Sequence, residues 1–406
     1  MIFVKYAVLL CDGMADYPVP ELNNQTPMEA ANKPTMDALA KVSELGLMKT
    51  VPDGMPAGSD VANLSVIGYD PAGCYTGRSP LEAANIGVDM ADDDVALRCN
   101  LVTLSDEPVY AEKRMVDYCG GDISTAEADE LVKALQAAFG GGEFDFYTGT
   151  AYRHCLIWHG GKTELGKITP PHDISGRVVG EYLPNDPAAA KLKEIMEKSV
   201  AVLENHPVNV ARREKGLSPA TSAWFWGQGS RPALDNFKEK YGLDAAMISA
   251  VDLLKGIGKL AGMKVYNVEG ATGYIDTNFD GKAAAAIDAF KTGCDYVYIH
   301  VEAPDECGHR GEIQNKPRSI ELIDEKILTP LLAFLRESGE DFALLICPDH
   351  PTPLSIRTHV ADCVPYLLYR SNAEVNGADR FTEQTAKDTG RFLPRASDML
   401  SKMLKK

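Results

Sequence analysis

The sequence lacks any pair of cysteines spaced as C-x-x-C, although it contains nine cysteines. Scattered single cysteines in an odd number argue against a disulfide framework, and they favour reduced thiols in the cytoplasm. The chain also lacks an apolar run of membrane-spanning length. The run at 4–10 is too short, and no small-residue cleavage site follows it. We therefore expect neither a signal peptide nor a membrane anchor.

Positive charge is scarce, because 41 Lys and Arg stand against 58 Asp and Glu, which gives a net charge of −17. Nucleic acids and anionic membranes are bound through clustered Lys and Arg, so neither is an expected partner. An anionic substrate would have to be met by a local basic pocket or by a metal. Internal repeats and low-complexity segments are lacking too, and 406 residues suffice for one to three domains.

Strands and helices alternate strictly after residue 232. The expected helices are 233–240, 251–261, 280–292 and 317–338, and the expected strands are 245–250, 263–268, 295–301, 342–347 and 364–369. The first sixty-odd residues show the same alternation, with a strand expected at 6–10 and a helix at 35–45. Alternation of this kind predicts an α/β fold with a doubly wound, mostly parallel sheet.

The middle of the chain has a different pattern. Strands are expected at 97–104, 109–118, 144–147, 153–158 and around 224–226, and helices at 124–139 and 187–204. Ser124 and Glu127 form a capping box that opens the first of these helices. We expect residues 1–70 and 228–406 to form one catalytic domain, into which residues 71–227 are inserted as an α+β substrate-binding domain.

Three of the expected strands end in an acidic residue. Asp12 follows the first strand, Asp305 follows strand 295–301, and Asp349 follows strand 342–347. In open α/β sheets, ligands bind at the carboxyl ends of the strands. A single acid at such a place could be a polar loop residue or a helix cap, but three together indicate a common site.

Histidines accompany these acids. His309 lies four residues after Asp305, so one helical turn places both side chains on the same face. His350 follows Asp349 directly, and His359 lies nearby in the chain. Carboxylates and imidazoles that converge at strand ends can hold divalent metals. We therefore predict a two-metal site, in which two ions about 4 Å apart would suit phosphoryl transfer.

Ser59 stands at the apparent start of a helix, after a turn shaped by Pro56 and Gly58. The free N–H groups of a helix start favour anions such as phosphate. A plain capping serine is the alternative interpretation. With a metal pair nearby, Ser59 is the expected nucleophile.

Several motifs in this sequence together resemble the alkaline phosphatase superfamily, and more closely the archaeal type of cofactor-independent phosphoglycerate mutase. They are Asp12-Gly13, Gly58-Ser59-Asp60-Val61-Ala62, Glu302-Ala303-Pro304-Asp305 with His309, Asp349-His350, Thr358-His359 and the stretch 270–277. The resemblance covers nearly the whole chain. It implies one metal held by Asp305, His309 and His359, and a second held by Asp12, Asp349, His350 and the Ser59 oxygen. All seven ligands are N or O, so Mn²⁺, Mg²⁺ and Zn²⁺ are possible, and the resemblance favours Mn²⁺ or Mg²⁺.

The same resemblance implies a reaction in two displacements. Ser59 would take the phosphate of 3-phosphoglycerate as a phosphoserine and return it to the other hydroxyl, giving 2-phosphoglycerate, with the inserted domain closing over the substrate. One alternative is a related phosphotransferase such as a homoserine kinase, although no complete phosphate-binding loop is found. A non-catalytic metal-binding protein is the other alternative, and the presence of Ser59 argues against it.

Cationic side chains should bind the carboxylate and phosphate of a small substrate. Arg153 is the first candidate because arginine can grip such groups with two parallel hydrogen bonds. His154 could face the substrate, and Lys255 resembles a substrate lysine of the wider family. Arg212 and Arg231 are weaker candidates, since solvated surface charges are the alternative. Oligomeric state cannot be inferred from the sequence.

Overall fold

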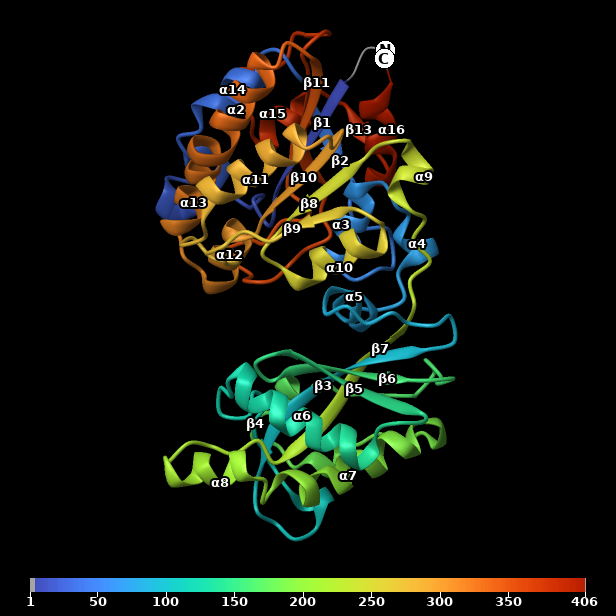
Figure 1. The fold of residues 1–406 in the computed structure, drawn as a ribbon. Helices are drawn as coiled ribbons and strands as arrows, with labels where there is room; N and C mark the ends of the chain where they lie inside the picture. The colour runs from blue at the N-terminus through green and yellow to red at the C-terminus, as the bar shows by residue number, and fades with distance from the viewer. Residues whose placement is uncertain (1–3, 406) are drawn as a thin grey trace. The chain divides into compact units, whose positions relative to one another are not determined.

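A computed structural model describes residues 4–405 and divides into two compact units (Figure 1). One unit contains the chain up to Tyr75 and from Ala233 onward, and the other is Thr76–Pro232. Each division lies five residues beyond the boundary expected from the sequence, at 75 against 70 and at 232 against 227. No helix among the described residues is long and apolar enough to cross a membrane.

The first unit is built on an eight-stranded sheet with the order β13-β2-β12-β11-β1-β10-β8-β9. Its strands are β1 (Val4–Cys11), β2 (Glu44–Met48), β8 (Ala245–Ile248), β9 (Lys264–Tyr266), β10 (Tyr296–Val301), β11 (Asp341–Cys347), β12 (Val364–Arg370) and β13 (Phe392–Leu393). β12 runs antiparallel to both of its neighbours, and every other pairing is parallel. The predicted mostly parallel α/β sheet is thereby confirmed.

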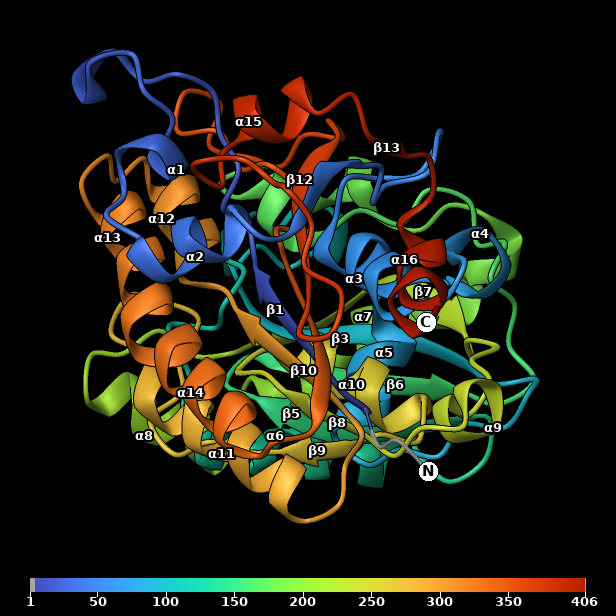
Figure 2. The ribbon, with the colours of Figure 1, turned by 90° about the horizontal axis from the view of Figure 1, so that it is seen from above.

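Helices cover both faces of this sheet. They are α1 (Pro27–Ala30), α2 (Pro34–Ala40), α3 (Ser59–Ile67), α4 (Pro71–Cys74), α9 (Phe237–Tyr241), α10 (Asp252–Leu260), α11 (Phe279–Lys291), α12 (Ala303–Arg310), α13 (Asn315–Ile323), α14 (Thr329–Glu337), α15 (Glu383–Asp388) and α16 (Met399–Leu404). Figures 1 and 2 show α2, α11, α13 and α14 on one face, and α3, α10 and α16 on the other. Successive residues of β1 point to opposite faces, so its continuous apolar run is buried on both.

Two predicted elements of the first unit differ in detail. The helix expected at 35–45 ends at Ala40, and strand β2 occupies Glu44–Met48, which no sequence signal indicated. The long helix expected at 317–338 is present as α13 and α14, joined by a π-helical turn at Asp324–Leu328. Asp324, in that turn, accepts hydrogen bonds from the backbone N–H groups of Thr35 and Met36, 3.0 and 2.7 Å away, and so caps α2.

The second unit contains a five-stranded antiparallel sheet. Its strands are β3 (Val95–Leu104), β4 (Met115–Asp117), β5 (Phe144–Thr150), β6 (Arg153–Trp158) and β7 (Ser222–Ser230), and its helices are α5 (Ser79–Asn85), α6 (Thr125–Phe139), α7 (Ala190–Leu203) and α8 (Pro207–Glu214). The predicted capping box at Ser124 and Glu127 opens α6. This unit is of the α+β class, as expected.

The prediction of one continuous strand at 109–118 is wrong. A 3₁₀ turn occupies Tyr110–Glu112, and only β4 is extended. The N–H of Ser105 donates to the carbonyl of Arg114 at 3.1 Å, and the Arg114 N–H donates back to the Ser105 hydroxyl at 2.6 Å. These bonds close a loop between two antiparallel strands, so the chain must turn where a continuous strand was expected.

Candidate metal centre

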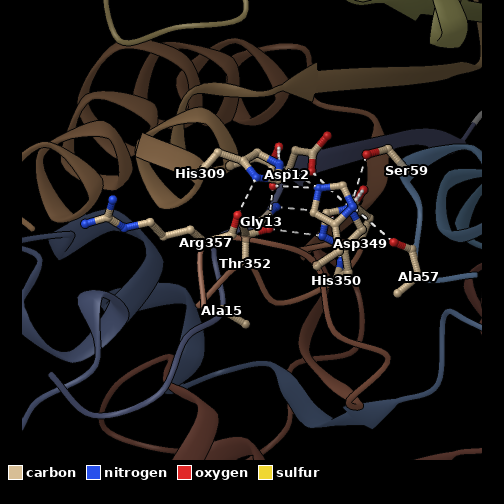
Figure 3. A network of polar contacts seen from close by, with 12 residues as sticks. Asp12, Gly13, Ala15, Ala57, Ser59, His309, Asp349, His350, Thr352 and Arg357 are labelled. Carbon is tan, nitrogen blue, oxygen red and sulfur yellow. Dashed lines mark hydrogen bonds and ion pairs between the residues drawn. The ribbon is translucent and has the colours of Figure 1, made fainter. Parts of the chain in front are cut away.

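The acidic and histidine side chains singled out in the sequence meet at one edge of the large sheet. Strand β1 lies between β10 and β11, with Cys11 beside Val301 and Leu10 beside Cys347. Parallel strands end at the same edge, so Asp12 and Asp349 come together directly after β1 and β11. Helix α12 follows β10 and carries the first histidine of the site. Figure 3 shows these side chains pointing toward one another.

The first ligand group consists of Asp305, His309 and His359. The two carboxylate oxygens of Asp305 lie 3.2 Å from His309 Nε2 and 3.3 Å from His359 Nε2. The two Nε2 atoms are 2.8 Å apart. Their donor atoms therefore converge on one small volume, as the ligands of a metal do.

The far side of each ring in this group is anchored by a backbone carbonyl. His309 Nδ1 is 3.0 Å from the Arg357 carbonyl, and His359 Nδ1 is 3.0 Å from the Ala57 carbonyl. A carbonyl only accepts, so each Nδ1 carries the proton and each Nε2 directs a lone pair inward. Two lone pairs at 2.8 Å require a cation or a proton between them. The hydrogen bond that protonated His309 donates to the Asp305 carboxylate raises the pKa of His309 to about 9, so this position favours positive charge.

The second group surrounds Ser59, the first residue of α3. The Ser59 hydroxyl lies 3.1 Å from His350 Nε2. The same nitrogen is 3.3 Å from Asp349 Oδ2 and 3.6 Å from Asp12 Oδ1. Asp305 also lies close to Asp12 and His350, with donor atoms within 4.8 Å of one another, so it borders both groups.

Charge balance in the second group favours a cation. Asp12 Oδ1 is buried and has no hydrogen-bond partner among residues 4–405. Burial raises the pKa of the Asp12 carboxyl, and the neighbouring carboxylates of Asp349 and Asp305 raise it further. An unpaired buried carboxylate is costly, and a divalent metal would remove that cost. The residues present thus fit the two metals that the sequence predicted.

Two supporting residues escaped the sequence-based prediction. His300 Nε2 is 2.8 Å from Asp12 Oδ2, so it holds one oxygen of Asp12 while the other faces the site. Asn63 donates to Asp349 Oδ2 at 2.9 Å and to the Ser59 carbonyl at 2.8 Å. Asn63 lies one helical turn after Ser59, so this spacing could have indicated it. His300 is buried within β10, and no spacing pattern in the sequence marks it.

Glycine at position 13 permits the close approach of β1 and α12. Its φ of +62° belongs to the left-handed region, and a Cβ there would lie 2.6 Å from the Cα of Asp305. Any side chain at this position would push Asp305 away from the site.

The expected substrate-binding residues are divided between the two units. Lys255 belongs to the first unit, in α10, with 18% of its side chain exposed and Nζ 3.9 Å from Asp252. Arg153, at the start of β6, is exposed. His154, next along the strand, is buried and therefore points to the opposite face. Arg231 donates to the Met90 carbonyl at 2.9 Å and lies near two exposed aspartates.

Arg212 is engaged within the second unit. Only 3% of its side chain is exposed, and it is paired with Glu127 at 2.8 Å. Its remaining donors reach the carbonyls of Gly120, Gly121 and Ser218, at 3.2, 2.7 and 2.9 Å. These bonds favour a structural role that ties α8 to the start of α6.

Known proteins match this chain over nearly its full length, and a family model matches part of it. A family model described as 2,3-bisphosphoglycerate-independent phosphoglycerate mutase matches residues 40–209. A protein of that name from Methanosarcina barkeri is 50% identical over 406 residues, which cover 99% of this chain and 100% of the relative. A probable enzyme of the same name from Geobacter sulfurreducens is 48% identical over 402 residues, covering 99% and 100%.

Two solved structures also match this chain over its full length. A protein from Pyrococcus horikoshii matches with a TM-score of 0.81 at 30% identity, covering 100% of this chain and 97% of that one. A cofactor-independent phosphoglycerate mutase from Thermoplasma acidophilum matches with a TM-score of 0.69 at 25% identity, covering 100% and 99%.

Proposed function

The chain belongs to the 2,3-bisphosphoglycerate-independent phosphoglycerate mutase family, and on that premise we propose that it interconverts 3-phosphoglycerate and 2-phosphoglycerate through a phosphoserine at Ser59. Membership of this family was predicted from the sequence motifs, and the relatives confirm it. The observation that carries the mechanism is the place of the Ser59 hydroxyl, at the start of α3 and 3.1 Å from His350 Nε2.

The reaction needs two transfers at one phosphorus atom. In the first, the Ser59 oxygen bonds to phosphorus, the bond from phosphorus to the C3 oxygen breaks, and the serine proton ends on that C3 oxygen. In the second, the C2 oxygen bonds to phosphorus, the bond to Ser59 breaks, and the proton of the C2 hydroxyl returns to the serine. No outside phosphate donor is consumed, which distinguishes a mutase from a kinase.

We further propose that two divalent metals serve this site, one held by Asp305, His309 and His359, and the other by Asp12, Ser59, Asp349 and His350. Bound there, Mn²⁺ or Mg²⁺, or else Zn²⁺, would neutralise the phosphate oxygens and favour the ionised serine.

The chain's own groups orient the reactants. The hydrogen bond from Asn63 to the Ser59 carbonyl fixes the first turn of α3, and the start of this helix favours the phosphate electrostatically. In the first unit, Lys255 is the cation we propose for substrate binding. In the second unit, Arg153 is the first candidate, because arginine can hold a carboxylate or a phosphate with two hydrogen bonds. His154 and Arg231 remain weaker proposals.

The deciding experiment is an assay of the purified, Mn²⁺-loaded protein with 3-phosphoglycerate alone, followed by detection of 2-phosphoglycerate. A parallel tube contains homoserine and ATP. We expect 2-phosphoglycerate in the first tube and no phosphohomoserine in the second. A protein that leaves 3-phosphoglycerate unchanged but phosphorylates homoserine would overturn the proposal in favour of the kinase. The Arg318→Met variant, altered at an exposed site on α13, is prepared in the same way and should keep wild-type activity.

A further inference from the structure

We propose that the hydroxyl of Thr352 is a positioning group shared by the two metal-ligand groups, orienting Asp305 in one and His350 in the other. This inference rests on the metal site proposed above. It concerns a residue that belongs to neither ligand group and that no motif indicated.

Thr352 follows β11 by five residues, and it is fully buried. Its Oγ1 donates a hydrogen bond to Asp305 Oδ1 and lies 3.3 Å from His350 Nδ1. Figure 3 shows Thr352 beside His350. One small side chain therefore contacts a carboxylate of the first group and an imidazole of the second. The described structure shows no other side-chain hydroxyl in contact with both groups.

The backbone around Thr352 is held on both sides. Its N–H donates to the Ala15 carbonyl at 3.3 Å, and its own carbonyl accepts from the buried Lys316 ammonium at 2.8 Å. Gly308 of α12 packs against it so closely that a Cβ there would lie 2.5 Å from the Thr352 carbonyl oxygen. The hydroxyl is consequently fixed in place before any ligand arrives.

The direction of the two bonds follows from a count of protons. A hydroxyl has one proton, and the Asp305 carboxylate can only accept, so that proton is directed to Asp305. The Thr352 oxygen must then accept from His350, which places the proton of the ring on Nδ1. His350 Nε2 is left with a lone pair directed at Ser59 and at the carboxylates of the second group. This is the form of histidine that binds metals.

The other two histidines are oriented differently. His309 and His359 donate to backbone carbonyls, and these carbonyls serve the first group alone. Among the side-chain hydroxyls of residues 4–405, that of Thr352 alone contacts both groups. Its removal should weaken metal binding at both sites at once, whereas loss of an ordinary outer partner would weaken one.

The test replaces Thr352 by Val, which has nearly the same shape but no hydroxyl. Calorimetric titration of the metal-free full-length protein with Mn²⁺, without substrate, measures both sites. We expect Thr352→Val to raise both dissociation constants by roughly 10- to 100-fold, the usual effect of losing an outer hydrogen-bond partner. Thr352→Ser keeps the hydroxyl and should stay within a few-fold of the wild type.

A matched control is Thr50→Val, because the Thr50 hydroxyl is buried in the same unit and has no hydrogen-bond partner among the described residues. This variant should bind Mn²⁺ as the wild type does. The proposal is overturned if Thr352→Val binds both ions with unchanged affinity, or if it weakens one site only. A lower unfolding temperature with unchanged affinities would show a purely structural role and would also overturn it.

If Thr352→Val does not fold, ¹⁵N NMR of selectively labelled histidines in the metal-free wild type decides, with His350→Asn used to assign the signal. The proposal requires the proton on Nδ1 of His350, and the opposite tautomer contradicts it. Neither measurement uses substrate, so the result is independent of the mutase assay.

Discussion

At the scale of single residues, the site is organised by hydrogen bonds that fix the direction of each donor atom. Carbonyls orient His309 and His359, and His300 holds one oxygen of Asp12 so that the other is directed into the site. The donor atoms are thereby oriented before any metal could bind.

Asp12, Asp305 and Asp349 could be predicted as site residues from the sequence. Each follows an apolar run, and this pattern is visible without a structure. The partners of these acids were not visible. His300 contacts Asp12 from a neighbouring strand 288 residues away in sequence, and Thr352 reaches Asp305 across 47 residues. Such contacts depend on strand order and side-chain direction, which no local pattern in one sequence specifies.

A residue-scale prediction concerns His154 in the second unit. Burial lowers the pKa of His154 to about 4, from 6.5 in the unfolded chain. The unfolded chain therefore takes up a proton at a higher pH than the folded chain does. Below pH 6.5 this lowers the free energy of unfolding, and the loss reaches about 3 kcal/mol as the pH falls to 4. We expect His154→Gln, which cannot titrate, to lose less stability over this interval than the wild type.

Urea unfolding followed by tryptophan fluorescence measures this effect, because all three tryptophans, Trp158, Trp224 and Trp226, lie in the second unit. Other titrating groups contribute equally to both proteins, so subtracting the pH dependence of the variant from that of the wild type leaves the contribution of His154. Equal pH slopes for the two proteins would contradict the assignment.

Among the helices, α13 is tied by a buried ion pair to the loops that carry the candidate metal ligands. Lys316 of α13 is fully buried and bonds Asp16 at 2.7 Å and the Thr352 carbonyl at 2.8 Å. It thus joins α13 to the segments that follow β1 and β11. We predict that Lys316→Met destabilises the first unit by about 3–5 kcal/mol, since Asp16 is left buried without its counter-charge.

The matched control is Arg318→Met on the same helix, which breaks a half-exposed pair with Glu321 at 2.9 Å. An effect of about 0–1 kcal/mol is expected there. Denaturant unfolding followed by far-UV circular dichroism gives both values. Similar losses for the two variants would show that Lys316 is no more important than a surface charge.

The element pattern was predictable where strands are buried on both faces, as in β1, β10 and β11, whose apolar runs are continuous. Prediction from the sequence failed for β2 and β4. β2 follows α2 after only three residues, so the sequence reads as one helix, and the fold decides otherwise by pairing β2 with β12 and β13. Pairing with distant strands outweighs local preference in such short segments.

At the scale of the whole molecule, the proposed metals belong to one unit only. Every candidate metal ligand lies in the unit that contains both chain ends, whereas the tryptophans lie in the other. Removal of metal with a chelator should therefore lower the unfolding temperature of the first unit. An ion present at about one hundred times its dissociation constant contributes roughly 2.7 kcal/mol per site.

Calorimetry with and without EDTA measures this shift, and tryptophan fluorescence follows the second unit in the same samples. We expect the fluorescence transition to move much less than the calorimetric transition of the first unit. An unfolding curve that EDTA leaves unchanged in both signals would contradict the metal site itself.

In the proposed reaction Ser59 carries the phosphate between the two hydroxyls, and this phosphate can be trapped on the protein. Metal-loaded protein is mixed with ³²P-labelled 3-phosphoglycerate, quenched in acid within one turnover, digested and mapped. We expect label on the peptide that contains Ser59. Ser59→Ala should give no label and at least about a thousandfold slower turnover. Ser65→Ala, which alters another serine of α3, should be labelled normally. Wild-type turnover by Ser59→Ala, or label on a different residue, would contradict the proposed reaction.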